Sequence, residues 1–226
     1  TSSGTAANAF TMNAADADVI LSTVNVLGAQ DLTARVTHAE VTGVTIDASD
    51  ATGSITLSVD RTGATTTATN ANLFTGIDNI ELRDSASPAV GGDSASVSGA
   101  KVGQKFTLAD DFNSTTFAFT NATGTADTAT IVLDNETAAT DTDVAAIDVQ
   151  NIETLTITSN GFATSTATTA NNLIDDLTGD ATTITVDGDT SIDVDFNIDN
   201  IATGTAVRTV TIDASGNTAF VDFEAA

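Results

Sequence analysis

Short apolar runs alternate with polar residues along most of the chain. Residues 55–59 read Ile-Thr-Leu-Ser-Val, and the same period of two recurs at 155–157, 184–186 and 192–196. This period places apolar side chains on one face of a strand and polar side chains on the other. Clusters of Gly, Asn and Asp separate the runs, as at 187–189. The pattern predicts an all-β protein.

Helical signal is confined to two short stretches. Residues 70–74 are expected to form one turn, and residues 168–177 two turns. The single proline, Pro88, marks the expected crossover between earlier and later strands.

Internal repetition refines the fold. Residues 41–60 read VTGVTIDASDATGSITLSVD and residues 207–226 read VRTVTIDASGNTAFVDFEAA, so eight of the first twelve positions are identical. An Asn-Ile-Glu motif occurs at 79–81 and 151–153, with a weaker Asn-Ile-Ala copy at 200–202. Retained strand motifs at unequal spacing favour a β-solenoid of the parallel β-helix or β-roll type with irregular loops. An antiparallel β-sandwich is the alternative.

These repeats lead to expectations about domains and conformation. We expect one elongated module over residues 1–226, and a division into sub-modules 1–90 and 91–226 stays open. The two VTIDAS copies should share one strand-and-corner conformation. In that conformation Val44 and Ile46 should be buried, as should Val210 and Ile212. Asn residues in the corners should adopt the left-handed conformation that a sharp bend requires.

The charge of the chain is strongly negative. Six Lys and Arg stand against 26 Asp and five Glu, which gives a net charge of −25. Such a charge opposes compaction unless cations neutralise it, and it disfavours a nucleic-acid partner. Asp is short, favours turns and is a common calcium ligand, so bound Ca²⁺ is the expected remedy. A halophilic or simply soluble acidic surface is the alternative.

The candidate calcium ligands are Asp residues in turns. Residues 187–189 read Asp-Gly-Asp, where the glycine permits a tight bend between two carboxylates. The other candidates lie in the VTIDAS copies and in two further turns. The full set is Asp187, Asp189, Asp180, Asp47, Asp50, Asp213, Asp141 and Asp143.

Enzymatic chemistry has little support. His38 is the single histidine, no G-x-S-x-G motif is present, and we expect His38 to be an ordinary surface or strand residue. Carboxylate pairs occur at 110–111 and 175–176, but the chain has no Trp or Tyr to hold a sugar beside them. The sequence therefore predicts a protein that is not an enzyme.

Threonine makes up about a fifth of the chain by count of the sequence. Thr-x-Thr rows at 154–158 and 183–185 are of the kind that binds ice on some β-solenoids. The unequal repeat spacing argues against regular stacking of these rows. The simpler interpretation is that threonine, as a β-branched residue, suits the solvent-facing side of a strand.

The absence of cysteine excludes disulfides and thiolate metal sites. No stretch reaches the roughly 18 consecutive apolar residues of a membrane helix. We therefore expect no insertion into a membrane.

The two repeat motifs resemble those of calcium-dependent bacterial S-layer proteins and related type I secreted repeat proteins. The matching segments are Asn-Ile-Glu-Thr-Leu-Thr-Ile at 151–157 and Val-Thr-Ile-Asp-Ala-Ser-Asp-Ala-Thr-Gly at 44–53. The resemblance implies a solenoid-like β fold, calcium-dependent assembly and a lattice on the cell surface. The glycine-rich nonapeptide calcium repeat of that class is missing, so calcium sites here would be irregular loops.

Together these observations predict a structural, extracellular module on the cell surface. It would self-assemble into a calcium-stabilised S-layer lattice or filament, with cell-surface polysaccharide as a further partner through another region. The alternative is an adhesin or an ice- or ligand-binding β-solenoid module of a secreted protein.

Overall fold

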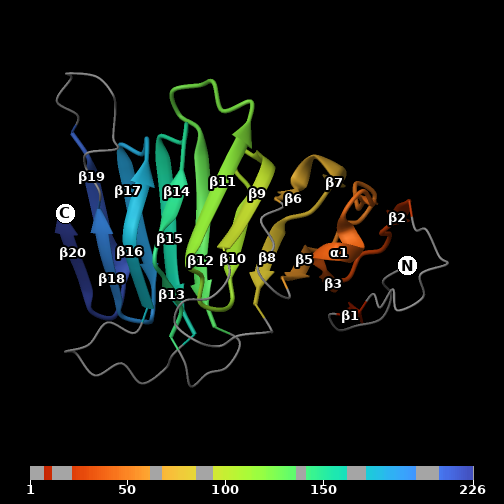
Figure 1. Ribbon diagram of the computed structural model, residues 1–226, viewed down its shortest axis with the longest axis horizontal. Coiled ribbons are helices and arrows are strands. Elements are labelled where there is room, and N and C mark those ends of the chain that lie inside the picture. Colours follow the sequence, from red (N-terminus) through yellow and green to blue (C-terminus); the bar gives the residue numbers. More distant parts are fainter. Residues whose placement is uncertain are drawn as a thin grey trace.

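The computed structural model describes residues 8–11, 22–61, 68–84, 94–135, 141–161, 172–196 and 209–225. Over these ranges the chain winds into a β-solenoid, in which each circuit, or rung, lies against the one before it (Figure 1). Every strand pair in the described ranges is parallel. The predicted all-β solenoid is therefore confirmed, and the antiparallel β-sandwich is excluded.

The longest wall of the solenoid is a nine-stranded sheet that runs from one end of the molecule to the other. Its strands, in spatial order, are β1 (Asn8–Thr11), β3 (Leu32–Thr37), β5 (Ile55–Asp60), β8 (Asn79–Arg83), β10 (Lys105–Leu108), β12 (Thr128–Asp134), β15 (Thr154–Asn160), β17 (Thr183–Gly188) and β19 (Thr211–Asn217).

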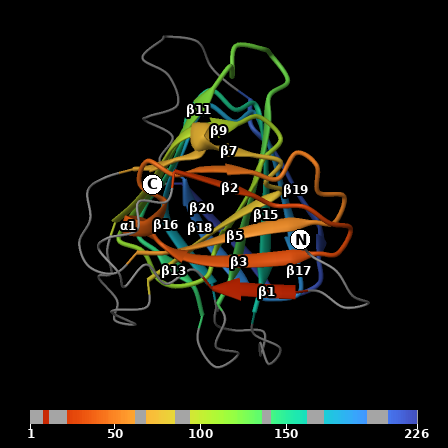
Figure 2. The same ribbon diagram turned by 90° about the vertical axis from the view of Figure 1, so that its right-hand side faces the viewer.

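An eight-stranded sheet faces it across the core, and a small sheet completes the walls at the N-terminal end (Figure 2). The eight-stranded sheet contains β20 (Val221–Ala225), β18 (Ile192–Phe196), β16 (Asn172–Gly179), β14 (Ile147–Val149), β11 (Ser114–Thr120), β9 (Ser94–Lys101) and β6 (Thr69–Asn70), with β13 (Asp143–Val144) pairing β16. The small sheet contains β2 (Thr23–Asn25), β4 (Thr45–Asp47) and β7 (Phe74–Thr75).

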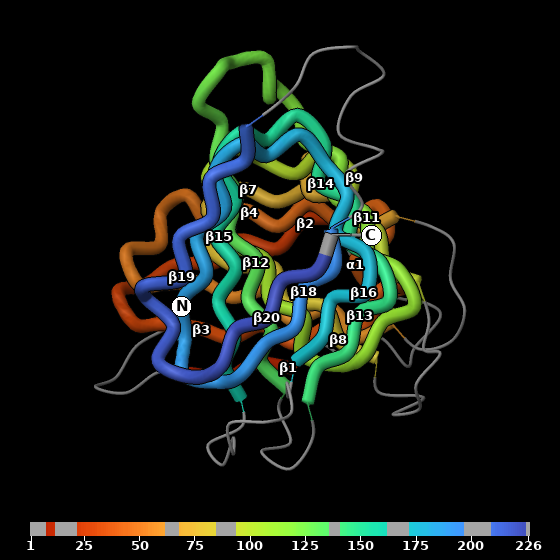
Figure 3. The backbone as a smooth tube through the Cα atoms, turned by 90° about the vertical axis from the view of Figure 1, so that its left-hand side faces the viewer, coloured from red at the N-terminus to blue at the C-terminus, as the bar shows by residue number. Residues whose placement is uncertain are grey.

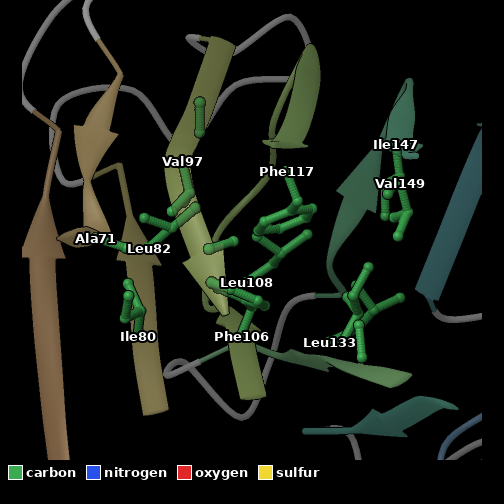
Figure 4. Packing of buried hydrophobic residues seen from close by; sticks show 14 of the residues in the cluster. Ala71, Ile80, Leu82, Val97, Phe106, Leu108, Phe117, Leu133, Ile147 and Val149 are labelled. Atoms are coloured by element: carbon green, nitrogen blue, oxygen red, sulfur yellow. The ribbon is translucent and has the colours of Figure 1, made fainter. Parts of the chain in front are cut away.

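The core is a set of inward columns that run along the solenoid axis. Each strand turns every second side chain inward, and parallel register sets equivalent side chains on top of one another. Phe106 from β10 meets Phe117 from β11 with ring centroids 4.6 Å apart, beside Val97 and Ile80 (Figure 4). One continuous column is formed by Leu57, Ile80, Phe106, Ile131, Ile157 and Val186.

Rung length varies while register is retained. Between paired positions of the nine-stranded sheet there are 23 residues from Leu57 to Ile80 and 29 from Ile157 to Val186. The additional residues lie between strands, so the strands still pair side by side. The expectation that unequal spacing prevents regular stacking of threonine rows is therefore wrong.

The short helices follow local capping chemistry. The turn predicted at residues 70–74 is confirmed as the 3₁₀ helix η1 (Ala71–Leu73), whose N-cap Asn70 accepts from the N–H of Asn72. Helix α1 (His38–Val41) begins with a capping box between Thr37 and Glu40. The Thr-x-x-Glu spacing of a capping box is present in the sequence, but the expectation that this stretch is a strand is wrong.

The prediction of a helix over residues 168–177 is wrong for residues 172–177, which are the part of this stretch that the structure describes. Residues 172–177 belong to β16, because Ile174 and Leu177 are inward residues that pair with β18 across a bulge. Tertiary pairing outweighs a weak local helical preference here. Residues 168–171, and the crossover expected at Pro88, lie outside the described residues.

The expected left-handed asparagine corners are present. Asn121 and Asn151 have φ values of 65° and 60°. Asn151 opens the second Asn-Ile-Glu motif, whereas Asn79 of the first is buried in β8 and accepts a hydrogen bond from Thr107. The two motifs therefore share strand character and differ in the role of their asparagine.

The two VTIDAS copies share a local bend but occupy different walls. Asp47 and Asp213 each accept the N–H of the residue two positions later, at 3.0 Å in both copies. Val44 and Ile46 are buried as predicted, but β4 belongs to the small sheet and β19 to the nine-stranded sheet. Ile212 is 41% exposed and Val210 is half-buried, so the prediction that this pair is buried is wrong for the single chain. The reason is that β19 has a neighbouring rung on one side.

Core packing gives a direct test of the inward columns. Phe106→Ala should lower the free energy of unfolding by about 3–5 kcal/mol, because the ring is fully buried and its removal leaves a cavity. The matched control Phe220→Ala, at a residue that is 41% exposed, should cost less than about 1 kcal/mol. Urea denaturation of both variants measures the difference, and equal losses would contradict the assigned core.

Candidate functional site

The eight predicted calcium ligands lie at strand ends and corners on several rungs. They are Asp47 at the end of β4, Asp50 in the following turn, Asp141 and Asp143 at the start of β13, Asp180 after β16, Asp187 and Asp189 around the end of β17, and Asp213 in β19. In the described part of the chain, no three Asp, Glu or His side chains come together in a way that could hold a metal ion.

Two of these carboxylates are used by their own bends. Hydrogen bonds from Ser49 hold the pKa of Asp47 below its ordinary value, and hydrogen bonds from Ser215 do the same for Asp213. Both side chains stabilise a local turn in their charged form. This role needs no cation.

Other carboxylates join neighbouring rungs. Oδ2 of Asp78 accepts the N–H of Ile55 at 2.7 Å, and Oδ2 of Asp180 accepts the N–H of Asn151 at 3.0 Å. Each bond spans one rung and satisfies a backbone donor where the strand ladder stops at a corner. The remaining carboxylates of this kind are Asp31, Asp110, Asp111 and Glu153.

The hydrogen bonding of carboxylates to an adjacent rung was not predicted, although the sequence contains a pattern that indicates it. An acidic residue directly precedes four strands of the nine-stranded sheet: Asp31, Asp78, Asp127 and Glu153. Asp31, Asp78 and Glu153 accept a backbone N–H of an adjacent rung from this position. Asp127 instead accepts the N–H of Gly124 in its own loop. Much of the Asp excess in the corners thus has a structural explanation.

The Asp-Gly-Asp segment is also a corner. Gly188 has a φ of 120°, and a Cβ at this position would overlap the carbonyl of Ser159 on the neighbouring rung. The N–H of Asp189 donates to that same carbonyl at 3.1 Å. The glycine therefore permits both the bend that was predicted and close rung-to-rung contact.

The strongest mutual repulsion surrounds Asp143. Burial, followed by the carboxylates of Asp141, Asp111 and Asp175 in that order, raises its pKa to about 6. Its backbone N–H nevertheless donates to Oδ1 of Asp111 at 2.9 Å. Of the predicted ligands, Asp141 and Asp143 are the pair that the fold brings among further carboxylates. A cation would relieve this repulsion.

His38 differs from its prediction as a surface or strand residue. It begins α1 and is 7% exposed, because its ring packs inward at a corner of the solenoid. Its Nδ1 lies 3.2 Å from the hydroxyl of Thr69, which also accepts from Arg61 at 3.3 Å. Burial and then Arg61 lower the pKa of His38. Among the described residues that line the adjoining cavity of about 560 Å³, none is acidic, so none of them could serve as an acid–base partner of His38.

The C-terminal end of the solenoid is open in the described structure. Strands β19 and β20 are terminal in their sheets, and they lie at the near end in Figure 3. Ile212 pairs with Ile184 in one inward column, but Ile184 is 3% exposed and Ile212 is 41% exposed. At the opposite end, β1 is terminal and its Phe10 is 48% exposed.

No protein-family model, curated protein or solved structure matches the chain. None of the helices in the described ranges is long and apolar enough to cross a membrane.

The Asp143 environment predicts a measurable pH dependence. Because its folded-state pKa lies above the ordinary 3.8, the folded chain binds more protons than the unfolded chain between about pH 4 and 6. This group therefore makes the free energy of unfolding fall as pH rises through that window. Asp143→Asn should raise stability at pH 7 by about 1 kcal/mol, after allowance for solvent screening, and change it little below about pH 4.

Thermal melts across this pH range check the effect. Asp50→Asn, at an exposed turn, is the control and should change stability little throughout. A loss of stability at pH 7 in Asp143→Asn would contradict the electrostatic assignment.

Proposed function

We propose that the chain is a structural module of an extracellular surface layer or filament, without enzymatic activity, that extends end to end. The observation that carries the proposal is that β19 and β20 are terminal in their sheets and that no described strand covers them. A terminal parallel strand presents unpaired backbone groups and an apolar column, which another parallel strand can cover. A second copy of the chain supplies such a strand in β1. The resemblance to S-layer repeat proteins supports the same conclusion.

The two ends have compatible columns. Phe10 pairs with Ala34 and therefore belongs to the inward column that continues through Leu57. That column reaches Val186 and then the region of Ala214 at the other end. In a head-to-tail stack, the large ring of Phe10 would lie over the small side chain of Ala214. This pairing of a large with a small residue suits close packing.

Charge favours this polarity. Residues 106–226 contain 20 Asp and Glu but one Lys or Arg, whereas residues 1–105 contain 11 and five. Two C-terminal ends would therefore repel each other more strongly than a C-terminal end and an N-terminal end. Head-to-tail contacts do not close on themselves, so they build filaments or lattice rows.

Substitution at the open rung tests the proposal. Ile212→Asp should weaken self-association at least about tenfold, because it removes buried apolar area and places a charge in the contact. Val102→Asp is the matched control, since Val102 is 38% exposed but lies between β9 and β10, away from either end. Sedimentation velocity over a concentration series, with electron microscopy of the particles, measures the difference.

Two outcomes would count against end-to-end growth. One is a wild-type chain that stays monomeric at high concentration in calcium, which would favour the adhesin alternative. The other is equal weakening by the two Asp variants, which would show that general negative charge, and not the open rung, controls association.

We propose that calcium ions neutralise the negative charge of the acidic rungs. The support is the net charge of −25 together with the crowding of Asp111, Asp141, Asp143 and Asp175. Because no three described acidic side chains come together to hold a metal ion, a calcium ion there would take at most two of these carboxylates as ligands, and backbone carbonyls and water would complete its coordination. Calcium bound there would replace the protons that the raised pKa of Asp143 retains at lower pH.

Melting experiments test the calcium proposal. Each occupied site should add about 2.7 kcal/mol when free calcium is 100 times its dissociation constant. The gain should be larger at pH 7 than at about pH 5 and should shrink in an Asp141→Asn, Asp143→Asn double variant. The matched Asp187→Asn, Asp189→Asn variant tests the other predicted pair. Equal midpoints in chelator and calcium, or an equal gain in sodium chloride of the same ionic strength, would refute chelation.

A further inference from the structure

One outer face of the solenoid carries a regular array of threonines. It spans four consecutive strands of the nine-stranded sheet: β12, β15, β17 and β19. We name it the threonine grid, and it comprises Thr128, Thr130, Thr154, Thr156, Thr183, Thr185 and Thr211.

Backbone pairing fixes the geometry of the grid. One row runs across the strands as Thr128, Thr154, Thr183 and Thr211, each paired with the next. The second row runs parallel to it as Thr130, Thr156 and Thr185. Neighbours within a row are about 4.8 Å apart, and the two rows are about 6.6 Å apart along the strands. Rung length does not disturb these spacings, because the additional residues lie outside the strands.

The side chains of the grid are available and already ordered. Thr128 and Thr211 are exposed and the other five are half-buried, as expected where neighbours shield one another. Elsewhere, Thr107 and Thr178 bond to neighbouring groups through their hydroxyls, whereas no bond within the described ranges occupies a grid hydroxyl. A β-branched side chain has restricted χ1, so little conformational entropy is lost when a ligand docks.

The grid is neutral within the most acidic part of the molecule. Residues 106–226 carry 20 of the 31 acidic residues, yet none of them lies within the two rows until Asp213 ends the second. Acids stand at its margins instead, with Asp127 before β12 and Asp187 beside Thr158. The uncharged area is therefore bounded by charge.

These properties restrict the ligand. Protein partners usually anchor on Trp, Tyr or Arg, and sugars stack on aromatic rings, but the grid offers none of these groups. Nucleic acids and anionic membranes are repelled by the surrounding carboxylates. The ligand that fits is therefore an uncharged, rigid and periodic surface. Its repeat distances would match the fixed spacings of the threonine hydroxyl and methyl groups in the grid.

We propose that the threonine grid binds the surface of ice. Water oxygens in ice repeat over distances of the same size as the grid spacings, so several hydroxyls can engage one crystal plane together. The methyl groups of the same residues order water between the rows. The grid lies on the side of the solenoid and not at its ends, so this activity is independent of end-to-end assembly.

Thermal hysteresis of the full chain tests the proposal, together with the shape of ice crystals grown in its presence. The wild type should shape ice and separate its freezing and melting points in a concentration-dependent way. Thr156→Lys should abolish most of this activity, because it places a long charged side chain at the centre of the grid. The variant should fold, since Lys105 occupies the same row position on β10, where it pairs with Thr130.

Thr116→Lys is the matched control, because Thr116 is exposed on β11 of the opposite sheet. It should retain the activity, and circular dichroism should show that both variants are folded. A folded wild type without thermal hysteresis or ice shaping would overturn the proposal, as would equal activity in the two variants. Retention on microcrystalline cellulose without any effect on ice would assign the grid to a crystalline polysaccharide instead.

Discussion

Parallel pairing between successive rungs is the interaction on which the rest of this structure depends. A parallel strand cannot satisfy its backbone groups alone and needs a neighbour on each side. In the interior, each rung provides that neighbour and also covers the apolar column of the rung before it. The same constraint applies to β19 and β20, which no described strand covers, and it explains why Ile212 is exposed while its paired neighbour Ile184 is buried.

The acidic composition follows partly from this architecture. Corners interrupt the strand ladder, and carboxylates such as Asp78 and Asp180 accept the backbone donors that remain there. Short side chains suit this position, which accounts for the preference for Asp over Glu. The arrangement also has an electrostatic cost, because many carboxylates lie along a molecule that has only six Lys and Arg side chains to offset their repulsion. At Asp143, burial and then the neighbouring carboxylates raise the pKa to about 6.

The sequence predicted the features that depend on local pattern. Alternation identified strands such as Ile55–Asp60, and unequal repeats favoured a solenoid over a sandwich. It could not reveal register, because register depends on which rung each strand meets. For that reason the stacking of Thr154 on Thr183 and the different walls of the two VTIDAS copies were missed. Among the candidate carboxylates, Asp47 and Asp213 accept backbone N–H groups within their own bends, whereas Asp180 accepts one from the adjacent rung, a contact that no local motif can predict.

The central claim is that the terminal rung is competent to accept another. Amide hydrogen exchange, followed by mass spectrometry at low and high protein concentration, tests it most directly. We expect the amides of β19 and β20 to exchange rapidly in the dilute chain. On association these two strands and β1 should gain protection from exchange, whereas β10 and β12 should stay protected at both concentrations. Association that protects an internal stretch and leaves β19, β20 and β1 unchanged would contradict it.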